Sequence, residues 1–321
     1  MFGALFAGSA IALAGALASG SVAIPPGELW LALTGGGSEI TRTVVLELRL
    51  PRALAAFATG GLLALAGALM QVLLRNPLAD PYVLGISGGA AVAALLAIMA
   101  GLSGFWIDAG AFGGALAATL MVFAIARGPG GWTPARLLLT GIVMAAGFSA
   151  VISLLLALGT DSSLRGMLFW LMGDLSFANR PGRLLVMLAA AVVASFAFAR
   201  PLNVLARGDV QARLLGVPVR MLRIAVYVAA SLLTALAVTT AGTIGFVGLV
   251  VPHLLRLAAG ADHRIVLPGA VLLGGSLLVL ADTLARIALA PRQLPVGALT
   301  AMIGVPLFII LMNRQQTTDH R

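Results

Sequence analysis

Arginine residues interrupt this chain at intervals close to the length of a membrane-spanning helix. An arginine at the centre of a bilayer costs about 2.5–3.5 kcal/mol, so arginines are expected at the ends of spans. About 20 mostly apolar residues are needed to cross the hydrocarbon region. The spacing therefore predicts one span within each of the intervals 52–75, 136–165, 183–200, 264–286 and 292–314.

Two longer intervals between arginines have room for two spans each. Residues 75–127 are expected to break near GLSGFWIDAG, around Asp108, and residues 223–256 at the glycines of AGTIGFVG. The apolar stretch from Met1 to Ala23 has no basic residue before it, so it is interpreted as a first span and not as a signal peptide. The sequence therefore predicts an all-α membrane protein of about ten transmembrane helices, with residues 1–321 forming a single transmembrane domain.

An even number of spans places both termini on one side of the membrane. With both termini in the cytoplasm, twelve of the 20 arginines fall on the cytoplasmic side, the direction that the positive-inside rule favours. The other eight are expected on the outer side, and they are Arg42, Arg49, Arg52, Arg165, Arg180, Arg183, Arg286 and Arg292.

The composition agrees with a membrane protein and excludes several kinds of chemistry. The chain is 60% hydrophobic and 10% charged, with a mean hydropathy of +1.07. It has no cysteine, which excludes disulfides and thiolate metal sites, and no lysine, which excludes a P-loop for ATP. The net charge of +9 does not form a basic stripe, so nucleic acid is not an expected partner. No catalytic constellation or cofactor site is apparent, so we expect no enzymatic activity in this chain.

The segment QVLLRNPLADPYVLGISGGA places a polar turn between two apolar spans. Proline disfavours helix in the residue before it, so Asn76 and Asp80 are expected to break the chain in two steps. Asp80 and Ser87 are expected to accept hydrogen bonds from free backbone N–H groups of the next helix.

This string, with LRLPR before it, resembles the FecCD-type permeases, the membrane subunits of ABC importers for cobalamin, ferric siderophores and heme. AGTIGFVGLVVPHLLRLAAGADHR and QLPVGALTAMIGVPLFIILM resemble later helices of the same family. The resemblance covers essentially the whole chain and implies a type II ABC importer permease of ten helices. It also implies a homodimer in the bacterial inner membrane, two ATP-binding cassette ATPase subunits, a periplasmic binding protein and transport by alternating access.

The cytoplasmic loop at about residues 200–223 is the longest polar stretch. Its centre is typical of a short amphipathic helix that ends at Gly216. The resemblance implies that this helix couples the permease to the ATPase, although a basic loop near anionic lipid would have a similar composition. The implied ATPase contacts are Asp209, Gln211, Ala212, Arg213, Leu215 and Gly216.

Three outer arginines are implied by the resemblance to dock the binding protein, namely Arg49, Arg52 and Arg286. Exposed arginine is suited to this role because its guanidinium pairs with a carboxylate through two hydrogen bonds. The alternative is that these side chains anchor helix ends at lipid headgroups.

The resemblance implies that the fifth and last spans line the translocation pathway, which makes Ser149 and Ser153 candidates for its wall. Met144, Met167 and Met302 could supply soft contacts to a large conjugated cargo. His253 and His263 could serve as heme ligands, but both fall near the cytoplasmic ends of spans, and a structural role is preferred. We expect no resident metal.

The sequence does not choose the cargo. Heme is preferred because the expected pathway is apolar and contains methionine and phenylalanine, and cobalamin or a ferric siderophore is the alternative. An ion-coupled secondary transporter would need an ionisable residue inside a span, and Asp282 is the best candidate for one. An intramembrane enzyme would need a catalytic constellation in the bundle, and none is found.

Overall fold

The computed structural model describes residues 1–20, 23–128, 132–176, 178 and 181–319, with the side chains of 312–319 left aside. Within these ranges every regular element is a helix. Arg180 and Arg321, which the topology prediction used, lie outside the described residues, as does the side chain of Arg314.

Among the described residues, six helical segments are long and apolar enough to cross a membrane, and four shorter helices are apolar. Six and four make ten, which confirms the predicted all-helical bundle of about ten spans. The long segments are α3–η1–α4 (Glu39–Leu74), α6 (Phe105–Ala126), α7 (Pro134–Leu158), α9 (Gly182–Ala206), α11 (Val219–Ala241) and α13 (His263–Ile287). The shorter ones are α1 (Phe2–Ala18), α5 (Ile86–Met99), α12 (Val247–Ala259) and α14 (Val296–Asp319, apolar to Leu311).

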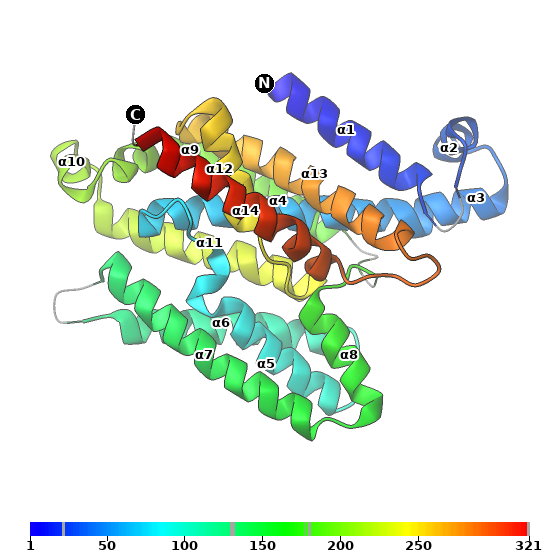
Figure 1. Cartoon of the computed structure of the whole chain (residues 1–321), viewed down its shortest axis with the longest axis horizontal. Coiled ribbons are helices and arrows are strands. Elements are labelled where there is room, and N and C mark those ends of the chain that lie inside the picture. Colours follow the sequence, from blue (N-terminus) through cyan, green and yellow to red (C-terminus); the bar gives the residue numbers. More distant parts are fainter. Residues whose placement is uncertain (21–22, 129–131, 177, 179–180, 320–321) are drawn as a thin grey trace.

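The first long segment begins with α3 (Glu39–Thr43) and the π-helix η1 (Val44–Arg49), which continue into α4. Four short elements lie between the spans, namely α2 (Pro26–Leu33), the 3₁₀-helix η2 (Pro81–Leu84), α8 (Asp161–Met172) and α10 (Asp209–Leu214). The bundle is elongated, with α10 at one end and α2 and α3 at the other (Figure 1). We call these the α10 end and the α3 end.

Both predicted breaks occur where glycine permits an unusual backbone. The chain leaves α5 and enters α6 through Gly101 and Gly104, whose φ angles of 70° and 48° favour glycine. This break precedes Asp108, which already lies in the first turn of α6, so its predicted position is a few residues too late. The second break separates α11 from α12 at residues 242–246, as predicted.

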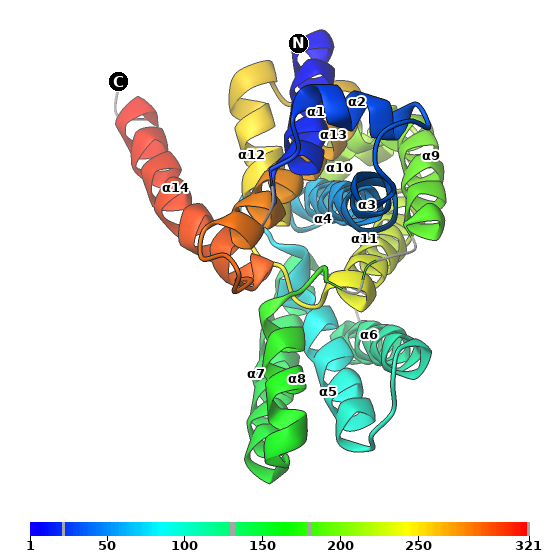
Figure 2. The same ribbon diagram turned by 90° about the vertical axis from the view of Figure 1, so that its right-hand side faces the viewer.

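The helix α4 (Leu50–Leu74) runs through the centre of the larger helix group. Figure 2 shows α1, α9, α11, α12 and α13 placed around it. Nearly every residue from Ala53 to Leu74 is buried. A helix that is apolar on all sides needs such surroundings, so its uniform composition and its central position agree.

Glycines allow the helices around α4 to approach it closely. A Cβ atom on Gly60 would overlap the carbonyl of Gly274 in α13, and one on Gly67 would overlap the carbonyl of Gly248 in α12. In lipid the hydrophobic effect does not drive helices together, so association depends on close packing of small residues of this kind.

A second helix group, formed by α5, α6, α7 and α8, lies to one side of the first (Figure 2). Gly89 and Gly114 bring α5 and α6 together, again without room for a Cβ atom. Leu95, Leu155 and Met167 form the small core that joins α5, α7 and α8.

The polar turn between α4 and α5, in the segment QVLLRNPLADPYVLGISGGA, folds back into the bundle before α5 begins. Asp80 accepts a hydrogen bond from the backbone N–H of Tyr82 at 2.7 Å, as predicted. The Tyr82 hydroxyl in turn accepts from the N–H of Ile244 at 3.1 Å, in the break before α12. Gly85, and not Ser87, caps α5. Side-chain oxygens therefore accept hydrogen bonds from backbone N–H groups in the irregular segments inside the bundle, where no water is available to accept them.

A matched pair of glycine variants tests the close packing on α4. We expect Gly67→Ala to lower the thermal unfolding midpoint in detergent, because overpacking costs about 1–3 kcal/mol. Gly147→Ala is the control, since a Cβ on Gly147 of α7 meets nothing within 4 Å. Equal midpoints for both variants would contradict the packing argument.

Candidate functional site

The helix α10 projects from the α10 end of the bundle, between α9 and α11 (Figure 1). Gly208 precedes it with a φ of 125°, and Gly216 follows it with a φ of 77°. Both angles favour glycine, so the two residues define where this short helix begins and ends. The predicted short helix ending at Gly216 is therefore confirmed.

Asp209 fastens α10 to two spans. Its carboxylate pairs with Arg75 at the end of α4 and with Arg223 Nη2 of α11 at 2.8 Å. The carboxylate also lies in the first turn of α10, where a negative charge is favoured. One aspartate thus fixes the loop helix against the central helix and its neighbour.

Large apolar side chains are exposed on α10 and directly after it. Leu214 is 82% exposed, and Val210, Leu215 and the nearby Met221 are also largely exposed. Val210 and Leu214 are on α10, Leu215 directly follows it, and Met221 is in the first turn of α11, next to the exposed Arg220. We call Val210, Leu214, Leu215 and Met221 the α10 face. Clustered exposed apolar side chains of this kind indicate a protein interface.

Two of the six predicted ATPase contacts do not present a free side chain. Ala212 is completely buried, and Asp209 is engaged in the two internal ion pairs. Gln211, Arg213, Leu215 and Gly216 are exposed. The sequence analysis missed Val210 and Leu214, whose i, i+4 spacing in a helix outside the spans was the available signal.

Asn203 organises a hydrogen-bonded turn at the same end. Its carbonyl oxygen accepts from the backbone N–H of His263 at 2.8 Å and lies 2.6 Å from Nδ1 of that ring. Its amide donates to Asp262 at 2.7 Å. Donation by the Arg264 N–H and by Asn203 holds the pKa of Asp262 below its usual range. His263 is buried and held in this turn, which supports a structural role and not a heme contact.

Toward the α3 end, Asp282 is also shared by two arginines, Arg52 and Arg286. We call these three residues the Asp282 clamp. The carboxylate is 1% exposed and is 2.8 Å from Arg52 Nη2 of α4 and 3.3 Å from Arg286 Nε of its own helix, α13. Arg52 Nη1 also donates to Gln293 at 2.9 Å, at the surface. Two guanidinium groups surround one buried carboxylate, so the positive charge that Asp282 needs is already supplied and a coupling cation is not required there.

The three predicted docking arginines all have partners within the bundle. Arg49 is only 6% exposed and donates to the carbonyls of Leu17 and Ala18 at 2.7 and 3.1 Å. Arg286 donates to Ala16 at 3.1 Å. These bonds satisfy the last carbonyls of α1, which an isolated helix leaves unpaired. Arg49, Arg52 and Arg286 are thus largely buried, and their role in docking stays a prediction.

The FecCD transport family model matches residues 4–314. The chain belongs to the FecCD transport family. It is similar to the vitamin B12 import system permease protein BtuC of Escherichia coli O127:H6, with 39% identity over 290 residues, covering 89% of this chain and 88% of the relative. BtuC of Salmonella typhi is 39% identical over 300 residues, covering 92% and 89%.

Solved structures agree with this assignment. A metal-chelate type ABC transporter in an inward-facing conformation has a TM-score of 0.87 and 31% identity, covering 97% of this chain and 98% of that one. PsaBC from Streptococcus pneumoniae, solved with a Fab, has a TM-score of 0.56 and 17% identity over 85% and 94%, which shows a shared fold alone. This FecCD chain is thus a membrane-spanning type II ABC importer permease, a transport subunit, as the motifs indicated.

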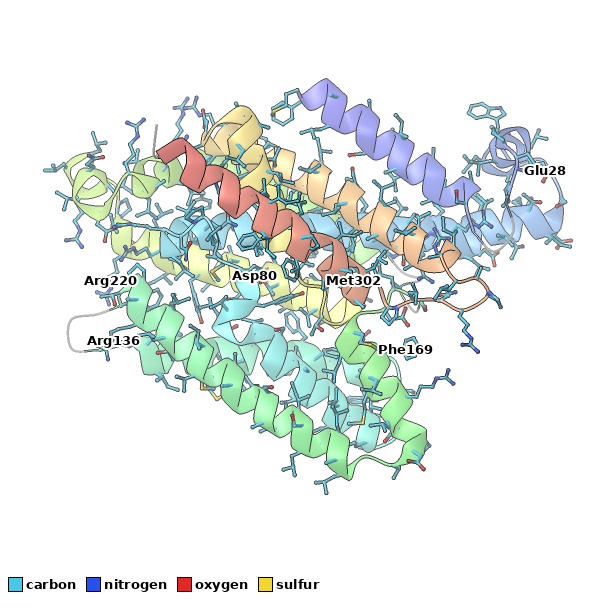
Figure 3. All side chains as sticks on the ribbon, in the orientation of Figure 1. Glu28, Asp80, Arg136, Phe169, Arg220 and Met302 are labelled. Carbon is cyan, nitrogen blue, oxygen red and sulfur yellow. The ribbon has the colours of Figure 1, made fainter. Side chains whose placement is uncertain are left out.

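The predicted pathway residues of this FecCD permease are only partly accessible. Ser149 and Ser153 are exposed on α7, and Met302 is exposed on α14 (Figure 3). Met144 is half-buried. Met167 is completely buried in the core between α5, α7 and α8, and its place in the pathway stays a prediction.

The Asp282 clamp gives a stability prediction. Asp282→Asn keeps the shape but leaves two largely buried guanidinium groups without a negative charge. Breaking a buried pair in this way costs about 3–5 kcal/mol, so we expect a clearly lower thermal unfolding midpoint in detergent.

The control for the clamp is Asp161→Asn, which changes an exposed aspartate at the start of α8. Its midpoint is expected to stay close to that of the wild type. If Asp282→Asn unfolds at the same temperature as Asp161→Asn, the clamp does not stabilise the bundle.

Proposed function

We propose that this permease is the membrane subunit of an ATP-driven importer in the bacterial inner membrane. Two copies form a homodimer, two separate ATPase subunits bind at the α10 end, and a periplasmic binding protein delivers cargo at the α3 end. The whole chain, residues 1–321, serves as one permease domain, and its coupling loop is at about residues 200–223. Alternating access then carries the cargo to the cytoplasm.

The α10 face carries this proposal. Its four apolar side chains are held outside the core on a helix that Asp209 ties to α4 and α11. A rigid apolar face of this kind suits a partner that must transmit movement to the spans. Since the chain has no lysine for a P-loop, the partner that supplies ATP hydrolysis is a separate subunit.

The arrangement of the termini supports a cytoplasmic α10 end. The first residues of α1 and the last residues of α14 both point toward α10 (Figure 1). Together with ten spans and the arginine bias, this supports a cytoplasmic location for both termini and the coupling loop. The Asp282 clamp then lies on the periplasmic side.

The dimer would use the side of the chain that carries α7 and α14. Figure 2 shows these helices on the side opposite α9, with α14 projecting from the larger helix group. Met302 and Ile309 on α14 and Val143 and Leu154 on α7 are all exposed. A second copy placed against this side would enclose Ser149 and Ser153 in a shared pathway.

Cobalamin is the cargo that we place first. The support is the 39% identity to two vitamin B12 import permeases over most of both chains. The preference for heme from the sequence relied on methionines, and the burial of Met167 weakens it. Heme and a ferric siderophore stay as predictions to be tested in parallel. The pairing of Asp282 with two arginines argues against an ion-coupled transporter.

Docking at the α3 end would extend the Asp282 clamp. A carboxylate of the binding protein could approach Arg52 at Nη1, which contacts Gln293 and Ser176 at the surface. This differs from docking on unpaired arginines, because the carboxylate of the partner would bind an arginine that is already paired with Asp282. Charge complementarity would still guide the encounter.

The α10 face gives a coupling prediction. We expect Leu214→Asp to weaken ATPase binding at least tenfold and to reduce ATP-driven uptake, because a buried interface anchor contributes about 2 kcal/mol or more. Binding is measured by the amount of ATPase that co-purifies with the permease. Leu102→Asp is the control, since Leu102 is exposed in the loop between α5 and α6. Equal co-purification of both variants would rule out the α10 face as the contact.

Gln293→Glu tests docking without removing the Asp282 clamp. The new carboxylate would occupy the exposed edge of Arg52, so binding-protein affinity should fall roughly fivefold at low salt and recover toward the wild-type value as salt is raised. The matched control is Gln211→Glu at the α10 end. An affinity unchanged by Gln293→Glu would remove Arg52 from the docking site.

Uptake into proteoliposomes tests the cargo. The permease, its ATPase and its binding protein are reconstituted together, and cobalamin, heme and a ferric siderophore are offered separately. We expect cobalamin to accumulate only when ATP is present inside. ATP-dependent accumulation of heme or siderophore alone would correct the cargo, and uptake driven by an ion gradient without ATP would reject the importer.

A further inference from the structure

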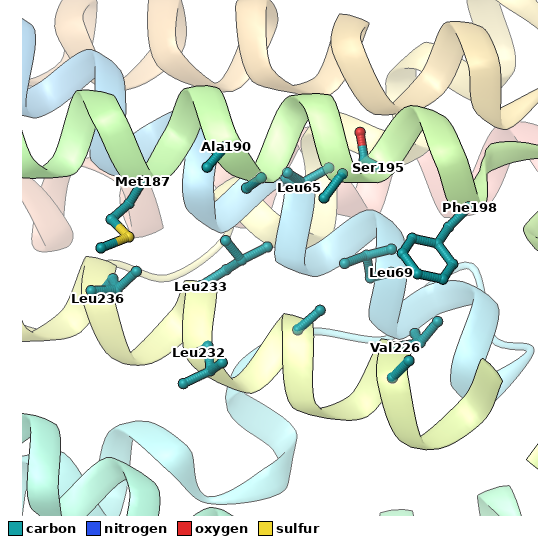
Figure 4. A pocket seen from close by; sticks show the side chains of 14 residues that line it. Leu65, Leu69, Met187, Ala190, Ser195, Phe198, Val226, Leu232, Leu233 and Leu236 are labelled. Atoms are coloured by element: carbon teal, nitrogen blue, oxygen red, sulfur yellow. The ribbon is translucent and has the colours of Figure 1, made fainter. Parts of the chain in front are cut away.

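An apolar groove runs along the outside of the larger helix group, between α9 and α11. Its floor is α4, its volume is about 340 Å³, and fourteen side chains line it (Figure 4). Ser195 is the one polar member, and its hydroxyl already donates to the carbonyl of Val192 at 2.7 Å. The groove therefore has nothing with which to bind a water-soluble ligand and is suited to hydrocarbon.

The groove faces the lipid. Both of its walls are helices that qualify as membrane spans. The helix α9 lies on the side of the chain opposite α7 and α14, so the groove is not part of the proposed dimer contact (Figure 2). The molecules that meet this surface in a membrane are lipids, whose acyl chains match its apolar lining.

Arg183 supplies a charge at one mouth of the groove. Met187 of α9 and Leu236 of α11 form that end (Figure 4). Arg183 precedes Met187 by four residues, so both side chains project from the same face of α9. Arg183 is exposed and has no ion pair or hydrogen bond within the part of the chain that the structure describes.

A guanidinium beside a hydrocarbon groove complements one kind of molecule. The phosphate of a glycerophospholipid accepts hydrogen bonds from arginine, and its acyl chain fills apolar space one helix turn further into the membrane. We propose that the groove binds one acyl chain of a phospholipid whose phosphate is held by Arg183. This proposal is independent of the cargo.

Two kinds of variant separate the acyl-chain contact from the phosphate contact. Ala190 and Ala194 line the groove with exposed side chains, so a larger residue at either position enters the groove and not the core. Arg183→Gln removes the charge alone. Arg42→Gln is the matched control, because Arg42 is another exposed arginine from the set predicted on the outer side, and it does not line the groove.

Native mass spectrometry of the full chain in detergent measures lipid retention. The probes are a phosphatidylglycerol and the diacylglycerol with the same acyl chains, which lacks the phosphate. We expect Ala194→Trp to reduce retention of both lipids at least tenfold, because the acyl chain loses its site. We expect Arg183→Gln to reduce phosphatidylglycerol retention about fivefold and leave diacylglycerol unchanged.

The controls make either part of the proposal falsifiable. Arg42→Gln should retain both lipids as the wild type does. Ala190→Leu replaces Ala194→Trp if the tryptophan lowers the thermal unfolding midpoint. Wild-type retention in the groove-filling variant would overturn the acyl-chain site. Equal phosphatidylglycerol retention in Arg183→Gln and Arg42→Gln would overturn the phosphate contact.

Discussion

Two aspartates, each shared by two arginines, hold the central helix α4 at both of its ends. Asp282 binds Arg52 in the first turn of α4 together with Arg286. Asp209 binds Arg75, directly after the last turn, together with Arg223. Between the clamps the helix is packed against its neighbours through glycines that exclude any side chain. One rigid helix therefore joins the two ends at which we propose that partners bind.

This arrangement changes how charge variants at these ends should be interpreted. Reversing Arg52 would remove a proposed contact with the binding protein and also leave Asp282 with one partner fewer. A loss of transport in such a variant would mix a docking defect with a folding defect. Substitutions at the edge of a clamp, such as Gln293, or on the α10 face separate the two effects because they leave the internal ion pairs intact.

The helical bundle could be predicted because a bilayer allows few kinds of structure to cross it. Arginine is costly inside lipid, so its spacing gave about ten spans, and proline and glycine marked the breaks. Pairing between distant residues could not be derived in this way. Nothing near Arg49 in the sequence shows that it bonds the last carbonyls of α1, and nothing near Asp209 shows that it meets Arg75. The burial of Ala212 and Met167 could not be derived for the same reason, since burial depends on helices that pack from elsewhere in the chain.

The most direct measurement is cross-linking from the α10 face to the ATPase subunit. The chain has no cysteine, so Leu214→Cys introduces a single thiol, and Leu102→Cys provides the control at a distant exposed loop. We expect a short reagent that couples to the thiol at one end and inserts photochemically into any neighbouring bond at the other to join Leu214→Cys to the ATPase subunit in the assembled complex, and not Leu102→Cys. Absence of that product, or equal products from both positions, would contradict α10 as the element through which ATP drives this permease.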